Sequence, residues 1–176
     1  MQFPVSRLLL ALWLGLMSGV VVAQADPPGD PAAVKLGDDG YWRDKNGDPT
    51  YKIEKDGTVD FATFQGFRRF NSTCFVCHGP DGSGSSFAPA LADSLKTMDY
   101  STFAGVVVNG RKDFLNGQDK VMPSFGDNKN VTCYLNDIYV YLRARSTGAL
   151  GRGRPPHHAQ KTGQYGDNED KCMADN

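Results

Sequence analysis

Apolar side chains at helical spacing mark residues 60–73 as a helix. Four phenylalanines recur every third position: Phe61, Phe64, Phe67 and Phe70. This spacing places them along one face of a helix, and Asp60 can cap the free amides at its start. Gly66, Phe70 and Cys74 follow in steps of four and so share a face. A glycine inside a helix costs about 1 kcal/mol relative to alanine. Gly66 is therefore either a place where another backbone packs closely or a glycine that is merely tolerated.

A second and stronger helical pattern covers residues 131–146. Its apolar positions follow i, i+4, i+7 and i+11: Val131, Leu135, Ile138 and Leu142. Arg143 and Arg145 suit the negative end of a helix dipole, and Gly148 predicts the end of the helix. This helix is the expected partner for the Gly66 face. A shorter helix is predicted over residues 99–109, where a valine triplet is equally compatible with a strand. The residues from 110 to 117 are predicted to form a loop.

The residues before these helices predict a leader and a small hairpin. Residues 8–22 are apolar, and Ala23-Gln24-Ala25 supplies the small residues that a signal peptidase reads. Residues 1–25 are therefore predicted to be a cleavable secretion signal. An uncleaved anchor is the alternative, although about 15 apolar residues are short for a bilayer span. In the extension at residues 26–59, Asn46-Gly47 is a pair suited to a tight turn, and the segments 41–43 and 50–53 beside it predict a β-hairpin.

The charge and the distribution of apolar residues indicate neither a nucleic-acid partner nor a membrane span in the mature chain. The chain carries 19 Lys and Arg against 20 Asp and Glu, a formal net charge of −1. Such a balance gives no reason to propose nucleic acid as a partner. After residue 25 no apolar run suggests a membrane span. The length predicts one small domain with extensions, and we expect a monomer.

The segment Cys74-Phe75-Val76-Cys77-His78 carries the most specific chemistry. Two thiols separated by two residues and followed by a histidine match the attachment site of a c-type haem. Each sulfur bonds to a vinyl group and the imidazole binds the iron. A thioredoxin-like motif would need an α/β pattern, and a zinc site would need a second ligand pair nearby. Because neither is present, the segment predicts one covalent haem c, which agrees with export to an oxidising compartment such as the periplasm.

Further residues are candidates for the surroundings of this iron. Pro89 lies a short loop after His78, so its carbonyl can accept the other ring N–H, unless Pro89 merely bends the loop. A methionine sulfur is a soft sixth ligand that raises the reduction potential relative to two imidazoles. Met122, which Pro123 stiffens, is favoured over Met98, because Met98 lies at a helix entry where core methionines are common.

Two cysteines remain once the haem thiols are assigned. In an exported protein, an even remainder favours a disulfide between Cys133 and Cys172, which would tie the tail to the last helix. Such a bridge would contribute about 4 kcal/mol in the chain-entropy model. A buried free Cys133, or intermolecular pairing through Cys172, is the alternative. His157 and His158 in the tail are predicted to be exposed and not to bind haem.

Three segments together carry a family pattern. Gly66, Phe70 and Cys74 have the spacing of an N-terminal cytochrome helix, residues 122–125 match an axial-methionine segment, and residues 138–142 match a C-terminal helix. Over residues 60–147 the chain therefore resembles the class I cytochromes c. The usual Gly-Pro after the haem loop is Ala88-Pro89 here. The resemblance implies three to five helices around one covalent haem, with Met122 as the sixth ligand.

The predicted fold is therefore all-α, with two additions to a class I cytochrome c domain at residues 60–147. A small β-hairpin belongs to the N-terminal extension at residues 26–59. The C-terminal extension at residues 148–176 is expected to be tied down by the disulfide.

A narrower resemblance concerns the C-terminal part of the chain. Residues 133–145 and 148–155 look like those of the four-cysteine cytochromes c associated with methanol and other alcohol metabolism. This likeness implies that electrons come from a quinoprotein alcohol dehydrogenase with pyrroloquinoline quinone and pass to a downstream cytochrome or oxidase. We therefore predict a periplasmic electron carrier and not an enzyme. Two alternatives stay open: a peroxidase-like haem enzyme or ligand sensor with a labile sixth ligand, and a haem subunit of a larger oxidoreductase.

Overall fold

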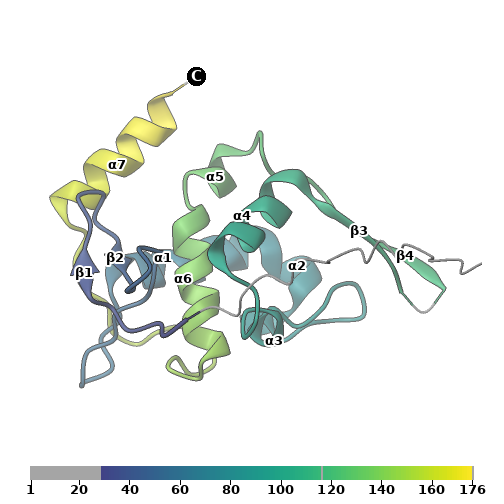
Figure 1. The fold of residues 1–176 in the computed structure, drawn as a ribbon, viewed down its shortest axis with the longest axis horizontal. Helices are drawn as coiled ribbons and strands as arrows, with labels where there is room; N and C mark the ends of the chain where they lie inside the picture. The colour runs from purple at the N-terminus through teal and green to yellow at the C-terminus, as the bar shows by residue number, and fades with distance from the viewer. Residues whose placement is uncertain (1–28, 116, 176) are drawn as a thin grey trace, which may run out of the picture.

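The computed structural model describes residues 29–115 and 117–175, so the predicted signal at residues 1–25 lies outside the described residues. The described part is mainly helical, with one small antiparallel sheet before the first helix and another after α4 (Tyr100–Asn109). Figure 1 shows the N-terminal sheet and α7 (Gly163–Ala174) at one end of the molecule and the second hairpin at the other. Among the described residues, no helix has both the length and the apolar character needed to cross a membrane.

Helices α1 (Phe61–Arg69) and α6 (Leu135–Ser146) cross at the centre of the molecule (Figure 1). A Cβ atom added to Gly66 would lie 1.8 Å from the carbonyl oxygen of Asp137. No side chain fits in such a space, so Gly66 is where a second backbone packs closely. The predicted cap is also present, because the Asp60 carboxylate accepts the Thr63 N–H at 2.9 Å.

Helix α1 continues directly into the segment with the two thiols. A π-helical turn over Phe70–Cys74 follows it, in which the Phe75 N–H donates to the Phe70 carbonyl, and α2 (Phe75–His78) comes next. The observed helical segment, which runs from Phe61 to His78, is therefore longer than the helix predicted over residues 60–73. A π turn adds a residue to the usual helical repeat, so the side chains after Phe70 leave the four-residue spacing that begins at Gly66.

The middle of the chain contains two short helices and a hairpin. Helix α3 (Leu91–Ser94) precedes α4 (Tyr100–Asn109), which Asp99 caps and Gly110 ends, so the helical alternative for residues 99–109 is confirmed. Strands β3 (Arg111–Leu115) and β4 (Gln118–Met122) then pair antiparallel, with Arg111 opposite Met122. The prediction of a loop over residues 110–117 was wrong. The hairpin extends away from the helices (Figure 1), so it lacks the apolar alternation that marks a half-buried strand.

The predicted helix over residues 131–146 is divided in two. Helix α5 (Lys129–Thr132) ends before Cys133, and α6 begins at Leu135. Tyr134 lies between them with φ −119° and ψ 20°, outside the helical region. The apolar stripe is confirmed as core, because Val131, Ile138 and Leu142 are buried.

The N-terminal hairpin is present, but one turn earlier than predicted. Strand β1 (Lys35–Leu36) pairs antiparallel with β2 (Trp42–Arg43). The chain does turn at Asn46-Gly47, where Gly47 has φ +88° and Arg43 forms an isolated bridge with Pro49. Across this turn the Thr50 N–H donates to the Trp42 carbonyl at 2.9 Å, while Ile53 pairs instead with Val59 in an isolated bridge. The predicted turn is therefore confirmed, and the pairing across it is present over residues 42–44 and 48–50, but it does not extend to residues 51–53.

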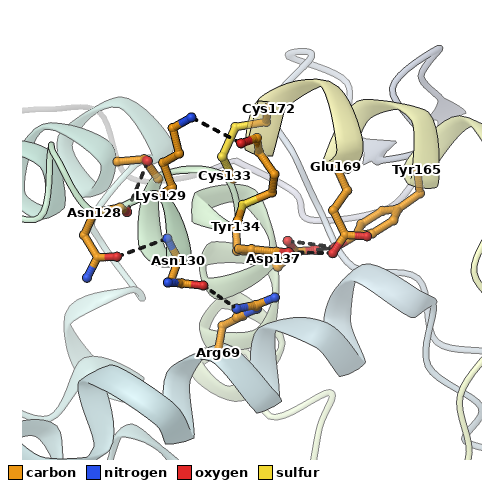
Figure 2. Close-up of a disulfide and its surroundings, with 12 residues drawn as sticks. Arg69, Asn128, Lys129, Asn130, Cys133, Tyr134, Asp137, Tyr165, Glu169 and Cys172 are labelled. Atoms are coloured by element: carbon orange, nitrogen blue, oxygen red, sulfur yellow. Dashed lines mark hydrogen bonds between the residues drawn. A yellow bond between two sulfur atoms is a disulfide. The ribbon is translucent and has the colours of Figure 1, made fainter. Parts of the chain in front are cut away.

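The C-terminal extension contains a helix that the sequence pattern did not reveal. Helix α7 (Gly163–Ala174) buries only Tyr165, so it has no apolar stripe to detect. The predicted disulfide joins Cys133 to Cys172 with an S–S distance of 2.06 Å, and it attaches α7 to the segment between α5 and α6 (Figure 2). The predicted exposure of His158 was wrong, because its partly buried ring stacks on Phe64 with the centroids 3.8 Å apart. His157 is exposed as expected.

Polar contacts support the disulfide on both sides (Figure 2). The Tyr134 hydroxyl donates to Glu169 on α7 at 2.6 Å, and the Lys129 ammonium donates to the Met173 carbonyl at 3.2 Å. The guanidinium of Arg69 on α1 lies 3.4 Å from the centroid of the Tyr134 ring. The last helix is therefore held to α5 and the α5–α6 junction, and Tyr134 of that junction also contacts the first helix.

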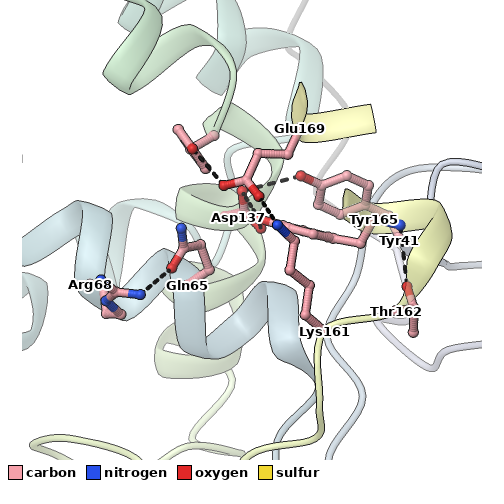
Figure 3. A network of polar contacts seen from close by, with 9 residues as sticks. Tyr41, Gln65, Arg68, Asp137, Lys161, Thr162, Tyr165 and Glu169 are labelled. Carbon is pink, nitrogen blue, oxygen red and sulfur yellow. Dashed lines mark hydrogen bonds and ion pairs between the residues drawn. The ribbon is translucent and has the colours of Figure 1, made fainter. Parts of the chain in front are cut away.

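A buried carboxyl joins both extensions to α6 (Figure 3). Asp137 is fully buried and accepts hydrogen bonds from the hydroxyls of Tyr41 at 3.1 Å and Tyr165 at 3.0 Å. Burial raises the pKa of Asp137 well above its usual range, and the two tyrosine hydrogen bonds offset only part of this effect. Tyr41 comes from the N-terminal extension and Tyr165 from α7, so one carboxyl connects three distant parts of the chain.

The helix crossing predicts a large cost for Gly66→Ala. The added methyl group would overlap the Asp137 carbonyl, so we expect the free energy of unfolding of the haem-loaded protein in urea to fall by about 2 kcal/mol or more. Gly105→Ala in α4 is the matched control, because nothing lies within 4 Å of its added Cβ. The control should be stabilised by about 0.5 kcal/mol or more. Equal effects in the two variants would contradict the close crossing.

The buried carboxyl predicts how stability depends on pH. Since the pKa of Asp137 is raised in the folded state, its contribution favours folding most below about pH 4, the usual range of a free carboxyl. That contribution is lost as the pH rises from about 4 toward the folded-state value. Asp137→Asn removes the titrating group, so its free energy of unfolding should decline less over this range than that of the wild type. Parallel pH profiles from urea unfolding would contradict the raised pKa.

Candidate functional site

The structure places the two thiols of the motif at the end of the long N-terminal helical segment. Cys74 closes the π-helical turn and is partly buried, whereas Cys77 lies in α2 and is exposed. Both are free thiols, while Cys133 and Cys172 are joined in the disulfide. Burial, and to a smaller extent the neighbouring Cys77, raises the pKa of Cys74 to about 11. The pair is therefore available for two separate thioether bonds.

His78 ends α2 with its ring in a defined orientation. The residue is only 6% exposed, and its Nδ1 lies 3.0 Å from the carbonyl oxygen of Pro89. A carbonyl can only accept, so Nδ1 carries the proton and Nε2 keeps its lone pair. Burial lowers the pKa of His78, and the Pro89 hydrogen bond offsets part of that effect. The result is a neutral imidazole with one nitrogen free to bind a metal.

The loop after His78 closes on itself and so brings Pro89 back to the ring. The Gly84 N–H donates to the His78 carbonyl at 2.8 Å, and the Ser85 hydroxyl donates to the Cys77 carbonyl. Gly79 has φ +70°, and a Cβ added to it would lie 2.3 Å from the Gly84 carbonyl oxygen. The loop therefore needs a residue without a side chain at position 79.

The structure fastens the segment around Met122 to the C-terminal end of α4. Met122 ends β4 and packs, partly buried, against the core. Just after it, the Ser124 hydroxyl donates to the Val108 carbonyl at 2.6 Å. The Lys120 ammonium donates to the Ser86 carbonyl at 2.7 Å, which links the hairpin to the loop after His78. Met98 is also partly buried against the core, so burial does not distinguish the two methionines.

Large apolar side chains are exposed in the segments next to these candidate ligands. Phe75 is 42% exposed and Val76 is 75% exposed, both between the two thiols. Phe87 in the following loop and Val121 beside Met122 are 72% and 60% exposed. A porphyrin is a large apolar ring, so apolar neighbours of two thiols and a neutral imidazole fit such a cofactor.

One residue of this region was not singled out from the sequence. Asp81 lies three residues after His78, and its buried carboxylate accepts the Gly153 N–H at 2.9 Å. The sequence of residues 79–86 predicts only a polar turn, and no sequence signal connects these residues with the C-terminal extension.

Comparisons with known proteins agree with this geometry. The family model described as cytochrome C oxidase, cbb3-type, subunit III, matches residues 62–142. Cytochrome c-553I of Paracoccus denitrificans is 48% identical over 137 residues, which cover 78% of this chain and 61% of that protein. Cytochrome c-555 of Methylococcus capsulatus is 38% identical over 96 residues, covering 54% of this chain and 72% of that protein. The crystal structure of the c-type cytochrome XoxG from Methylobacterium extorquens AM1 is similar with a TM-score of 0.72 and 44% identity, over 84% of this chain and 96% of that one.

The chain belongs to the c-type cytochromes. Members of this family carry covalently bound haem c, so haem c is the cofactor of this cytochrome. The predicted all-α cytochrome c fold and the predicted cofactor are thus both confirmed. The two free thiols and the neutral imidazole of His78 fit that cofactor chemically. The chain spans 61% of the length of the Paracoccus cytochrome.

Proposed function

We propose that this cytochrome is a periplasmic carrier of single electrons. Cys74 and Cys77 attach the haem, and His78 and Met122 bind its iron. The observation that carries the proposal is the hydrogen bond from the buried His78 ring to the Pro89 carbonyl, beside two free thiols. The haem supplies the redox chemistry, since its iron takes up and releases one electron. With an imidazole and a thioether as axial ligands, no iron position is open for a substrate, so the cytochrome is not an enzyme.

The Pro89 carbonyl has two effects on the proposed iron ligand. It holds the proton on Nδ1 of His78, so Nε2 always presents its lone pair. It also limits rotation of the ring and makes the imidazole more basic as a ligand. A fixed ligand changes its geometry little between the two oxidation states, which favours rapid electron transfer.

The proposal of Met122 over Met98 rests on how each methionine is held. Met122 follows a hairpin that Lys120 ties to the His78 loop, and Ser124 fastens the backbone after it. Met98 lies between α3 and α4, where its N–H donates to the Ser94 carbonyl. Met122 therefore belongs to a hairpin segment that is bonded to the loop of the other proposed ligand, whereas Met98 lies in the helical segment that follows that loop.

We further propose a quinoprotein alcohol dehydrogenase as the electron donor and a downstream cytochrome or oxidase as the acceptor. The support is the likeness of residues 133–145 and 148–155 to the four-cysteine cytochromes c of alcohol metabolism. The second cysteine pair of this chain, Cys133 and Cys172, is joined in a disulfide. That bridge keeps the C-terminal extension on the cytochrome domain.

Met122→Ala should remove the methionine-to-iron charge-transfer band of the ferric protein. The thioether is the soft sixth ligand in this proposal, so its loss opens the iron and lowers the reduction potential. Met98→Ala is the matched control and should keep both the band and the potential. An unchanged spectrum in Met122→Ala would contradict the assignment. Rapid binding of cyanide or carbon monoxide by the wild type at neutral pH would instead favour a haem enzyme or sensor.

Stopped-flow reduction tests the donor. The purified ferric cytochrome is mixed with reduced quinoprotein alcohol dehydrogenases, and haem absorbance reports the rate. We expect a saturating rate with a methanol-type dehydrogenase that exceeds the rate with an unrelated protein donor by about tenfold or more. Equal rates with both donors would reject the proposed partner while leaving the carrier function intact.

A further inference from the structure

Asp81 lies in the loop that orients His78 and has an unusual backbone. Its φ is +57°, and it is the one non-glycine residue with positive φ among residues 29–115 and 117–175. This left-handed conformation costs a residue with a side chain about 1 kcal/mol. The Asp81 side chain is also almost buried, with 10% of its surface exposed. Contacts of the carboxylate must therefore offset both costs.

The Asp81 carboxylate bonds the loop to the C-terminal extension. Its Oδ1 accepts the Gly153 N–H at 2.9 Å, and its Oδ2 accepts from Nε of Arg152 at 3.2 Å. The hydroxyl of Tyr141 on α6 donates to Oδ1 at 3.5 Å. Arg152 is 69% exposed at its side chain, so solvent screens its ion pair with Asp81. The bond from the Gly153 backbone is therefore the stronger of the two contacts to the extension.

The partner segment is itself held firmly. The Leu150 N–H donates to the Ala144 carbonyl at 3.0 Å, and Arg145 donates to the Leu150 carbonyl at 2.6 Å. On the other side, the Asp81 loop rests on α6, since a Cβ added to Gly82 would lie 3.0 Å from Leu142. Asp81 thus connects the loop after His78 to a segment that α6 holds in place.

We propose that Asp81 is a positioning residue for the haem ligand. Its side-chain oxygen holds the loop from Gly79 to Gly84 against Gly153, and that loop in turn keeps His78 in register with the Pro89 carbonyl. The inference rests on the proposed role of His78 as an iron ligand. It gives the C-terminal extension a function at the haem: through Gly153 and Asp81, the extension supports the loop that orients the His78 imidazole.

Three substitutions at Asp81 separate the effects of its hydrogen-bond acceptor, its charge and its left-handed backbone. Asp81→Asn keeps a side-chain oxygen for the Gly153 N–H and tolerates the left-handed backbone, but it loses the charge. Asp81→Ala loses the acceptor, and Asp81→Gly loses the acceptor while relieving the backbone cost. Arg154→Gln is the matched control, because Arg154 lies in the same segment over the Phe64 ring and is not among the described residues that form a hydrogen bond or ion pair with Asp81.

The experiment compares these variants as haem-loaded ferric proteins. The readouts are the hyperfine-shifted proton resonances of the haem methyls and the His78 ring, the reduction potential, and hydrogen exchange at the Gly153 amide. In the Ala and Gly variants, we expect shifted His78 and haem-methyl resonances, an altered potential, and about tenfold faster Gly153 exchange. The Asn variant and Arg154→Gln should retain the wild-type resonances. If Asp81→Ala does not load haem, the comparison of Asp81→Gly with Asp81→Asn decides the question.

Two results would overturn the inference. The first is unchanged haem resonances and potential in both Asp81→Ala and Asp81→Gly, even if stability falls, because Asp81 would then be purely structural. The second is an Asn variant that resembles Asp81→Ala, because charge and not the acceptor would then matter. If the wild type itself lacks resonances of an iron-bound histidine, the proposed ligand role of His78 fails instead. The two failures are therefore distinguishable in one set of spectra.

Discussion

The crossing of α1 over α6 is the constraint on which the rest of the structure depends. Gly66 allows the carbonyl of Asp137 to approach so closely that an added Cβ would lie 1.8 Å from it. Because α1 continues through a π turn into α2, this one crossing also sets where Cys74 and His78 lie. Asp137 contributes twice, since its backbone forms the crossing and its carboxyl accepts the tyrosine hydroxyls of both extensions.

Three of the contacts that hold the C-terminal extension to the helical core lie far apart. They are the disulfide between Cys133 and Cys172, the bond from Tyr165 to Asp137, and the bond from Gly153 to Asp81. The first two fasten α7, whereas the third reaches the loop behind the proposed iron ligand. In the role we propose for Asp81, this third contact supports the loop whose Gly84 N–H donates to the His78 carbonyl and whose Pro89 carbonyl accepts from the His78 ring.

Predictions from the sequence succeeded where the signal was local or chemical, and they failed where it was neither. The helix with Phe61 to Phe70 has a clear apolar stripe, and the pairing of Cys133 with Cys172 follows from assigning the other two thiols to haem. Helix α7 buries one residue and the β3–β4 hairpin projects from the helices, so neither has a periodic apolar face. His158 was misjudged because its partner, Phe64, lies far away in the chain.

The amino-acid sequence by itself determined the haem chemistry of this cytochrome, because thioether attachment needs two thiols and a histidine within five consecutive residues. It also determined the two principal helices and a candidate carbonyl for His78 at Pro89. Only the tertiary structure decided that Gly66 is a contact between backbones, that Nδ1 of His78 carries the proton, and that Asp81 meets Gly153. The last contact joins residues 72 positions apart, and burial determines its strength. The spacing of residues along the chain predicts neither that these two residues are close in space nor that their contact is buried.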